Sequence, residues 1–116
     1  MRRLLARCKP RWSTCLAAVL LAVVGSPDSV AAGKTHTVVI EGMAFHPQTL
    51  EAQAGDTVVW INRDIVPHTV TAASPKFDSG EIAAGRSWSR RFTSAGKVSY
   101  YCAYHPVMKA DVAVGR

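Results

Sequence analysis

Acidic residues are scarce in this chain: eight Asp and Glu stand against fourteen Lys and Arg, which gives a formal net charge of +6. Most of this excess positive charge lies near the N-terminus, where the first eleven positions contain five basic residues: Arg2, Arg3, Arg7, Lys9 and Arg11. Without residues 1–32, the chain has nine basic and seven acidic side chains, a net charge of +2. This mildly basic body has no stripe of charge for phosphates, so we expect no nucleic-acid partner.

The chain also lacks an apolar run long enough to span a membrane. Its longest run, residues 15–24, has ten residues, whereas a spanning helix needs about 20. The run follows the basic start and precedes Ser29-Val30-Ala31-Ala32, which is the layout of a helical secretory signal peptide. We therefore expect residues 1–32 to be a signal peptide cleaved after Ala31 or Ala32, and the protein to be periplasmic or otherwise exported. A retained membrane anchor is the alternative.

Cysteine is nearly absent from the remaining 84 residues, because Cys8 and Cys15 lie in the predicted signal peptide and only Cys102 follows it. One thiol cannot form an internal disulfide. In an oxidising compartment an unprotected thiol is easily oxidised, so a bound metal would explain its presence. We expect residues 33–116 to form a single small domain that a metal would help to stabilise.

Helical periodicity is missing after Gly33, whereas short β-branched and aromatic runs alternate with turn signals. The expected strands are Thr35–Ile40, Thr49–Ala52, Thr57–Asn62, His68–Ala72, Ser87–Phe92, Lys97–Cys102 and Ala110–Val114. The segment Phe77-Asp78-Ser79-Gly80 is expected to be a turn. This pattern predicts an all-β fold, a Greek-key β-sandwich of seven to eight strands.

The segment that carries chemistry is Cys102-Ala103-Tyr104-His105-Pro106-Val107-Met108, which has the spacing C-x2-H-x2-M. A thiolate, an imidazole and a weak axial thioether suit copper in both of its oxidation states. Structural zinc sites prefer four Cys or His ligands and rarely include Met. The motif therefore predicts a copper site that uses Cys102, His105 and Met108.

Such a site needs a second imidazole, and the candidates are His36, His46 and His68. His68 follows the strong strand 57–62 and a turn that ends in Pro67. Packing of that turn beside the 102–108 loop, at one end of the sandwich, would bring the ligands together on rigid elements. His36 and His46 are expected to have no role in the chemistry.

The span from about Thr35 to Val114 resembles the cupredoxin family, the blue type 1 copper proteins, and within it the amicyanin and plastocyanin branch. The resemblance rests on four segments: residues 54–62, Pro67-His68, residues 77–80, and Tyr100-Tyr101-Cys102 with the His and Met that follow. It implies a single copper ion with His68, Cys102 and His105 as trigonal ligands and Met108 as the axial ligand.

Two residues depart from the family pattern. Thr69 stands where the family often has Asn, so a link between the ligand loops must come from a shorter hydroxyl, although the backbone N–H toward the Cys sulfur is kept. Tyr104 stands where Pro often precedes the second His, so loop stiffness must rest more on Pro106. Neither change replaces a ligand.

Four protein ligands leave no open position on the metal, so we expect an electron carrier and no enzyme activity. The resemblance implies transient redox partners, with a dehydrogenase as possible donor and a c-type cytochrome as possible acceptor. The protein is expected to be a monomer with no stable membrane insertion after signal cleavage. The alternative is a periplasmic copper carrier or buffer; a copper enzyme and a metal-free adhesion sandwich are the other rival classes.

Overall fold

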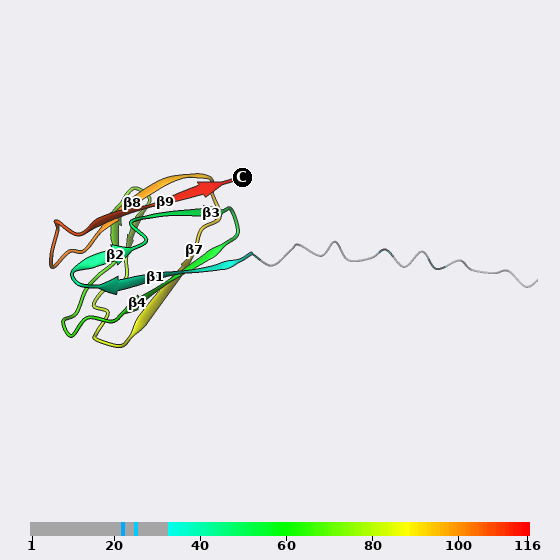
Figure 1. The fold of residues 1–116 in the computed structure, drawn as a ribbon. Helices are drawn as coiled ribbons and strands as arrows, with labels where there is room; N and C mark the ends of the chain where they lie inside the picture. The colour runs from blue at the N-terminus through cyan, green and yellow to red at the C-terminus, as the bar shows by residue number, and fades with distance from the viewer. Residues whose placement is uncertain (1–21, 23–24, 26–32) are drawn as a thin grey trace, which may run out of the picture.

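A computed structural model describes Ala22, Gly25 and residues 33–116, and these residues form nine strands in two sheets (Figure 1). The first sheet has the order β2-β1-β4-β7. Its strands are β1 (Thr35–Glu41), β2 (Ala44–His46), β4 (Thr57–Asn62) and β7 (Ser87–Arg91). The second sheet has the order β3-β9-β8-β5-β6. Its strands are β3 (Thr49–Gln53), β5 (Thr71–Ala73), β6 (Lys76–Asp78), β8 (Gly96–Tyr101) and β9 (Lys109–Gly115).

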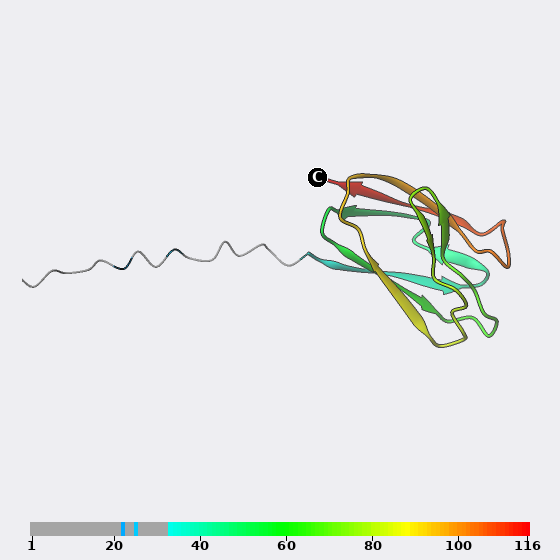
Figure 2. The same cartoon turned by 180° about the vertical axis from the view of Figure 1, so that it is seen from behind.

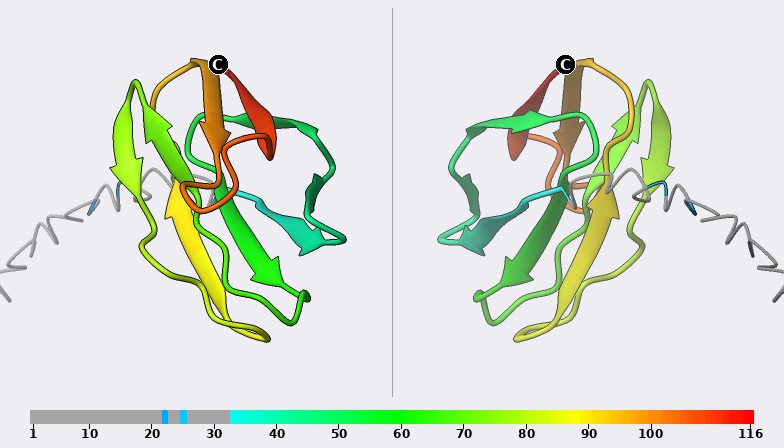
Figure 3. Two further views of the ribbon diagram at one scale, coloured as in Figure 1. Left: turned by 90° about the vertical axis from the view of Figure 1, so that its left-hand side faces the viewer. Right: turned by 90° about the vertical axis from the view of Figure 1, so that its right-hand side faces the viewer.

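The chain passes repeatedly between the two sheets, which face each other in Figures 2 and 3. Two of the pairings, β1 with β4 and β3 with β9, are parallel, and the others are antiparallel. The expected all-β Greek-key sandwich is confirmed. The expected signal peptide, residues 1–32, lies outside the described residues apart from Ala22 and Gly25. Across the part of the chain that is described, no helix has the length and apolar character needed to cross a membrane.

The strand count and two boundaries differ from the sequence-based expectation of seven to eight strands. The segment 76–78 is strand β6 rather than part of a turn, and the expected strand from His68 begins only at Thr71. The reason lies in the backbone around Val70, whose N–H donates to Ser79 Oγ and whose carbonyl accepts from Ser79 N–H. These bonds replace ladder pairing, and His68 forms only an isolated bridge with Ile82.

Alternation of buried and exposed positions places the core between the sheets. On β8, Val98 and Tyr100 point inward and are followed by buried Cys102, while Tyr101 is half-buried on the other side. Trp60 of β4 is fully buried and meets the Tyr100 ring edge to face, with ring centroids 5.5 Å apart. This contact packs one sheet against the other. It lies at Tyr100, two residues before Cys102.

The loops that follow β4 and β8 lie at the same end of the sandwich, away from the C-terminus (Figure 1). The green loop after β4 contains residues 63–70, and the orange-red loop between β8 and β9 contains residues 102–108. The expected convergence of these two segments is therefore present in the fold.

Candidate metal centre

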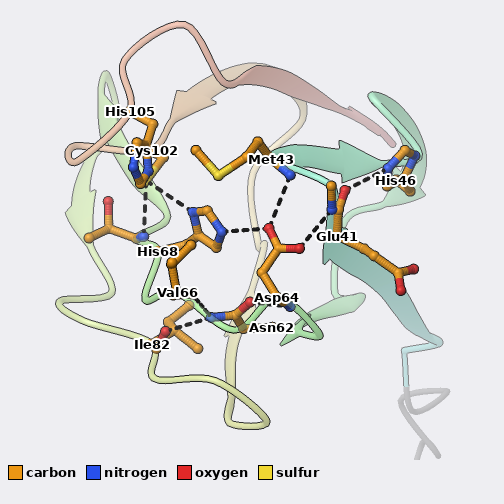
Figure 4. A network of polar contacts seen from close by, with 12 residues as sticks. Glu41, Met43, His46, Asn62, Asp64, Val66, His68, Ile82, Cys102 and His105 are labelled. Carbon is orange, nitrogen blue, oxygen red and sulfur yellow. Dashed lines mark hydrogen bonds and ion pairs between the residues drawn. The ribbon is translucent and has the colours of Figure 1, made fainter.

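Three metal-binding side chains come together where these two loops meet: His68, Cys102 and His105. The Cys102 sulfur lies 3.7 Å from His68 Nδ1 and 3.8 Å from His105 Nδ1 (Figure 4). All three donor atoms lie within 4.8 Å of one another. His68 and Cys102 have no exposed surface, whereas His105 is half-buried.

The turn that delivers His68 is shaped by Asn62, the last residue of β4, whose side chain is fully buried. The Asn62 amide nitrogen donates to the carbonyl oxygens of Val66, at 2.8 Å, and Ile82, at 2.9 Å. The amide oxygen accepts from Asp64 N–H at 2.9 Å. These bonds satisfy a buried polar side chain and fix the path of the chain from β4 to His68.

The orientation of the His68 ring is set by Asp64. Its carboxylate accepts a hydrogen bond from His68 Nε2 at 2.8 Å, and a carboxylate can only accept, so Nε2 carries the proton. Nδ1, which faces the Cys102 sulfur, then has a free lone pair for a metal. Sequence reasoning missed this role of Asp64. Its position four residues before His68, inside the ligand turn, was the available signal.

The Asp64 carboxylate also accepts from two backbone N–H groups, those of Gly42 at 2.7 Å and Met43 at 3.0 Å. Burial alone would raise the pKa of Asp64, but hydrogen bonds from Met43, His68 and Gly42 hold it below the ordinary value. The side chain is therefore a carboxylate at neutral pH. It joins the turn between β1 and β2 to the imidazole of His68 with a full negative charge.

The 102–108 loop is closed by its own backbone. Cys102 N–H donates to the Met108 carbonyl oxygen at 3.1 Å, and His105 N–H donates to the Cys102 carbonyl oxygen at 3.2 Å. Met108 N–H donates in turn to the His105 carbonyl oxygen at 2.9 Å. These bonds hold Met108 directly beside Cys102, and the Met108 side chain is only 4% exposed. The short spacing of the motif thus produces a compact loop that brings the Cys102 and His105 donor atoms together and holds the backbone of Met108 next to Cys102.

Thr69 links the two ligand loops in two ways. Its backbone N–H donates to the Cys102 sulfur at 3.3 Å, as the family resemblance implied. Its hydroxyl accepts from Ala103 N–H at 2.7 Å and lies 2.9 Å from the Thr71 hydroxyl, which donates to Asp78. Because the Thr71 hydroxyl donates its proton to Asp78, the Thr69 hydroxyl is the donor in the hydrogen bond between the two threonines. The short hydroxyl therefore does supply the link for which the family often uses Asn.

The two sulfur–nitrogen spacings fit ligands about 120° apart on one metal ion. For bonds of about 2.05 Å to nitrogen and about 2.3 Å to sulfur, values typical of zinc, a planar angle of about 120° separates the two atoms by about 3.8 Å. The two sulfur–nitrogen distances, 3.7 and 3.8 Å, agree with this value. One thiolate, two neutral imidazoles and a neighbouring thioether are the donor set that suits copper.

The other two histidines lie outside this cluster. His36 Nε2 pairs with Asp56 at 2.8 Å, near the start of β1 and β4. His46 Nε2 donates to the Glu41 carbonyl oxygen at 3.0 Å. Both therefore have structural partners of their own.

Comparison with known proteins agrees with the fold and the site. A profile of copper binding proteins of the plastocyanin/azurin family matches residues 31–115. Amicyanin of Paracoccus denitrificans is 30% identical over 122 residues, covering 87% of this chain and 93% of that protein. Plastocyanin of Scenedesmus fuscus is 30% identical over 74 residues, covering 54% of this chain and 76% of that protein.

Solved structures of copper proteins also superpose on this fold. A copper(I) amicyanin variant superposes with a TM-score of 0.67 and 34% identity, covering 74% of this chain and 86% of that one. A copper-containing nitrite reductase of Thermus scotoductus also reaches a TM-score of 0.67, with 26% identity, but this chain covers only 22% of it. That likeness concerns one part of a larger enzyme.

Fold, donor set and comparisons together define a cupredoxin, a β-sandwich that holds a single copper ion of type 1 at one end. The chain belongs to the plastocyanin/azurin family of copper binding proteins, as its amicyanin and plastocyanin relatives also indicate.

Proposed function

We propose that this protein carries single electrons between exported redox partners, with one copper ion bound by His68, Cys102, His105 and, axially, Met108. The observation that carries the proposal is the approach of two imidazole nitrogens to one buried sulfur, at 3.7 and 3.8 Å. Copper bound there would supply a one-electron couple between Cu(I) and Cu(II). The amicyanin and plastocyanin matches support a role as electron carrier rather than enzyme.

The residues around the site would keep the donor atoms in place in both oxidation states. His68 is held by Asp64 and by its backbone bridge to Ile82. Cys102 is held by the N–H of Thr69 and by the end of β8. Because these supports come from segments far apart in the sequence and from the end of β8, little rearrangement would be needed when the electron arrives, which favours rapid transfer.

His105 is the ligand placed to pass electrons to a partner, since it is the half-buried member of the set. Apolar side chains surround this end of the molecule: Ile65 is 94% exposed, Val107 89% and Tyr104 50%. Pro67 and Pro106 are exposed beside them. An apolar rim of this kind suits small, short-lived contacts with a redox partner.

The cellular setting is part of the proposal. We infer that residues 1–32 are removed as a signal peptide after Ala31 or Ala32, that residues 33–116 form one exported domain, and that the protein is a periplasmic monomer. As the family resemblance implies, a dehydrogenase would donate the electron and a c-type cytochrome would accept it. Sequencing of the N-terminus of the exported protein tests the cleavage; an intact Met1 would contradict it.

Electron transfer can be separated experimentally from copper carriage. The electron self-exchange rate of the copper-loaded protein should be fast, while exchange of bound copper with an added chelator should be slow. The reverse pattern would favour a copper carrier or buffer and would contradict an electron carrier. Protein purified from the exported fraction is the material for both measurements.

A further inference from the structure

Three of the four proposed copper ligands are shielded from solvent and only His105 is half-buried, so the metal needs a route inward. His68 and Cys102 are fully buried, and Met108 is 4% exposed. A cavity of about 240 Å³ lies on the Met108 side of the site. It is lined by Met43, Ala44, Phe45, His46, Gln48, Val107, Met108 and Lys109. Two thioether residues, one buried and one exposed, therefore line the same cavity.

Met43 is the exposed one, with 43% of its surface accessible, and core filling does not account for it. Its backbone φ is +59°, a conformation that is uncommon for residues other than Gly. The conformation is maintained by Asp64, whose carboxylate accepts the N–H groups of Gly42 and Met43 as well as His68 Nε2. Unusual backbone held in this way is typical of functional positions. Asp64 thus positions Met43 and the proposed ligand His68 together.

Figure 4 shows the Met43 side chain running from this turn toward Cys102 and His105. His46, which also lines the cavity, points away from Cys102 and His105 and bonds to the Glu41 carbonyl oxygen. The thioether of Met43 is therefore a partly exposed soft donor on the Met108 side of the proposed site.

We propose that Met43 captures Cu(I) at the mouth of this cavity and passes it to Met108 and Cys102. A thioether is a soft, neutral donor that favours Cu(I) over Cu(II). The step is an exchange of ligands with no electron transferred: copper remains Cu(I), leaves the donors of the delivering molecule, and binds the Met43 sulfur. The Cys102 thiol releases its proton to solvent when its sulfur takes the metal. This inference rests on the proposed copper function.

The test compares copper uptake by the wild-type apo-protein and the variant Met43→Leu. Leucine keeps the bulk and removes the sulfur, and the backbone N–H that bonds to Asp64 is retained. Under anaerobic conditions, Cu(I) is supplied as its bicinchoninate complex, and loss of the complex's colour reports uptake. We expect uptake to slow by about tenfold, the lower end of effects seen for supporting residues at metal sites. The colour and potential of the loaded protein should stay unchanged.

Two comparisons give the experiment its specificity. Uptake of Cu(II) should be equal in wild type and Met43→Leu, because thioether sulfur is a poor donor for Cu(II). His46→Gln changes another residue that lines the cavity, and it should leave Cu(I) uptake at the wild-type rate. Equal Cu(I) uptake by Met43→Leu and wild type would overturn the capture role, as would equal slowing of Cu(I) and Cu(II). Failure of wild-type protein to bind copper at all would instead refute the proposed function.

Discussion

The hydrogen bond from His68 to Asp64 permits a quantitative test through the variant Asp64→Asn. The amide has nearly the same shape as the carboxylate, and its oxygen can still accept from His68 Nε2 and Met43 N–H. The other position then carries an NH2 group that faces the Gly42 N–H, which loses its acceptor. The main change is therefore the loss of one negative charge close to a proposed ligand.

The size of the effect follows from the geometry. Asp64 Oδ2 lies 2.8 Å from His68 Nε2. The imidazole ring and one metal–nitrogen bond add about 4 Å, so the charge would be about 7 Å from the metal. At an effective dielectric constant of about 20, a unit charge at that distance contributes about 2.4 kcal/mol. One-electron transfer converts this energy to about 100 mV, and partial exposure of the carboxylate reduces it, so we expect about 50–100 mV.

The expected shift in midpoint potential is positive. The oxidised site has the higher charge, so a neighbouring carboxylate stabilises it, and removal of that carboxylate raises the midpoint potential. Protein-film voltammetry of the copper-loaded variant measures the shift. The exposed Glu41 offers a control. Glu41→Gln removes a negative charge from the end of β1 and leaves the hydrogen bond between His68 and Asp64 in place. A potential unchanged in Asp64→Asn, or lowered, would refute the argument, as would an equal rise in Glu41→Gln.

Three further outcomes follow from the structure. Thr69→Val should lower the free energy of unfolding by about 0.5–1.5 kcal/mol in denaturant titration, because Ala103 N–H loses its acceptor in a partly buried bond, whereas Thr69→Ser should stay near wild type. His105→Gly should keep the fold but lose the blue charge-transfer band, and a variant that stayed blue without added imidazole would contradict its role as a ligand. Hydrogen bonds from His36, Gln53 and Lys34 lower the pKa of Asp56 from 3.8 to about 2. Stability should therefore fall as the pH drops from about 3.8 toward about 2, and Asp56→Asn should remove this part of the acid dependence.

Much of the fold could be predicted because its signals are local. Strands β4, β8 and β9 were predicted from their own residues, and the structure confirms them with a buried residue at every second position over most of each strand. Strands β2 and β6 were not predicted, since each has only three residues. Three residues are too few for a periodic pattern, and these strands exist through pairing with β1 and β5.

The site was predictable to a similar extent. The spacing of Cys102, His105 and Met108 lies within one loop, so the sequence displays it directly. The assignment of His68 as a ligand required the further expectation that two loops far apart in the sequence lie at the same end of the sandwich. The sequence offered only the position of Asp64, four residues before His68, as a signal for its role, and it offered none for Met43, because both roles depend on the turn between β1 and β2 packing against the ligand turn. No local pattern encodes that contact.

The central claim is that copper binds to the sulfur of Cys102 between His68 and His105. The most direct measurement is titration of the apo-protein with Cu(II), followed by visible absorption and electron paramagnetic resonance. We predict that one equivalent gives an intense blue band and the narrow copper hyperfine splitting of a thiolate-bound site, and that Cys102→Ser gives neither. A colourless protein with wide hyperfine splitting, or a band that persists in Cys102→Ser, would contradict the claim.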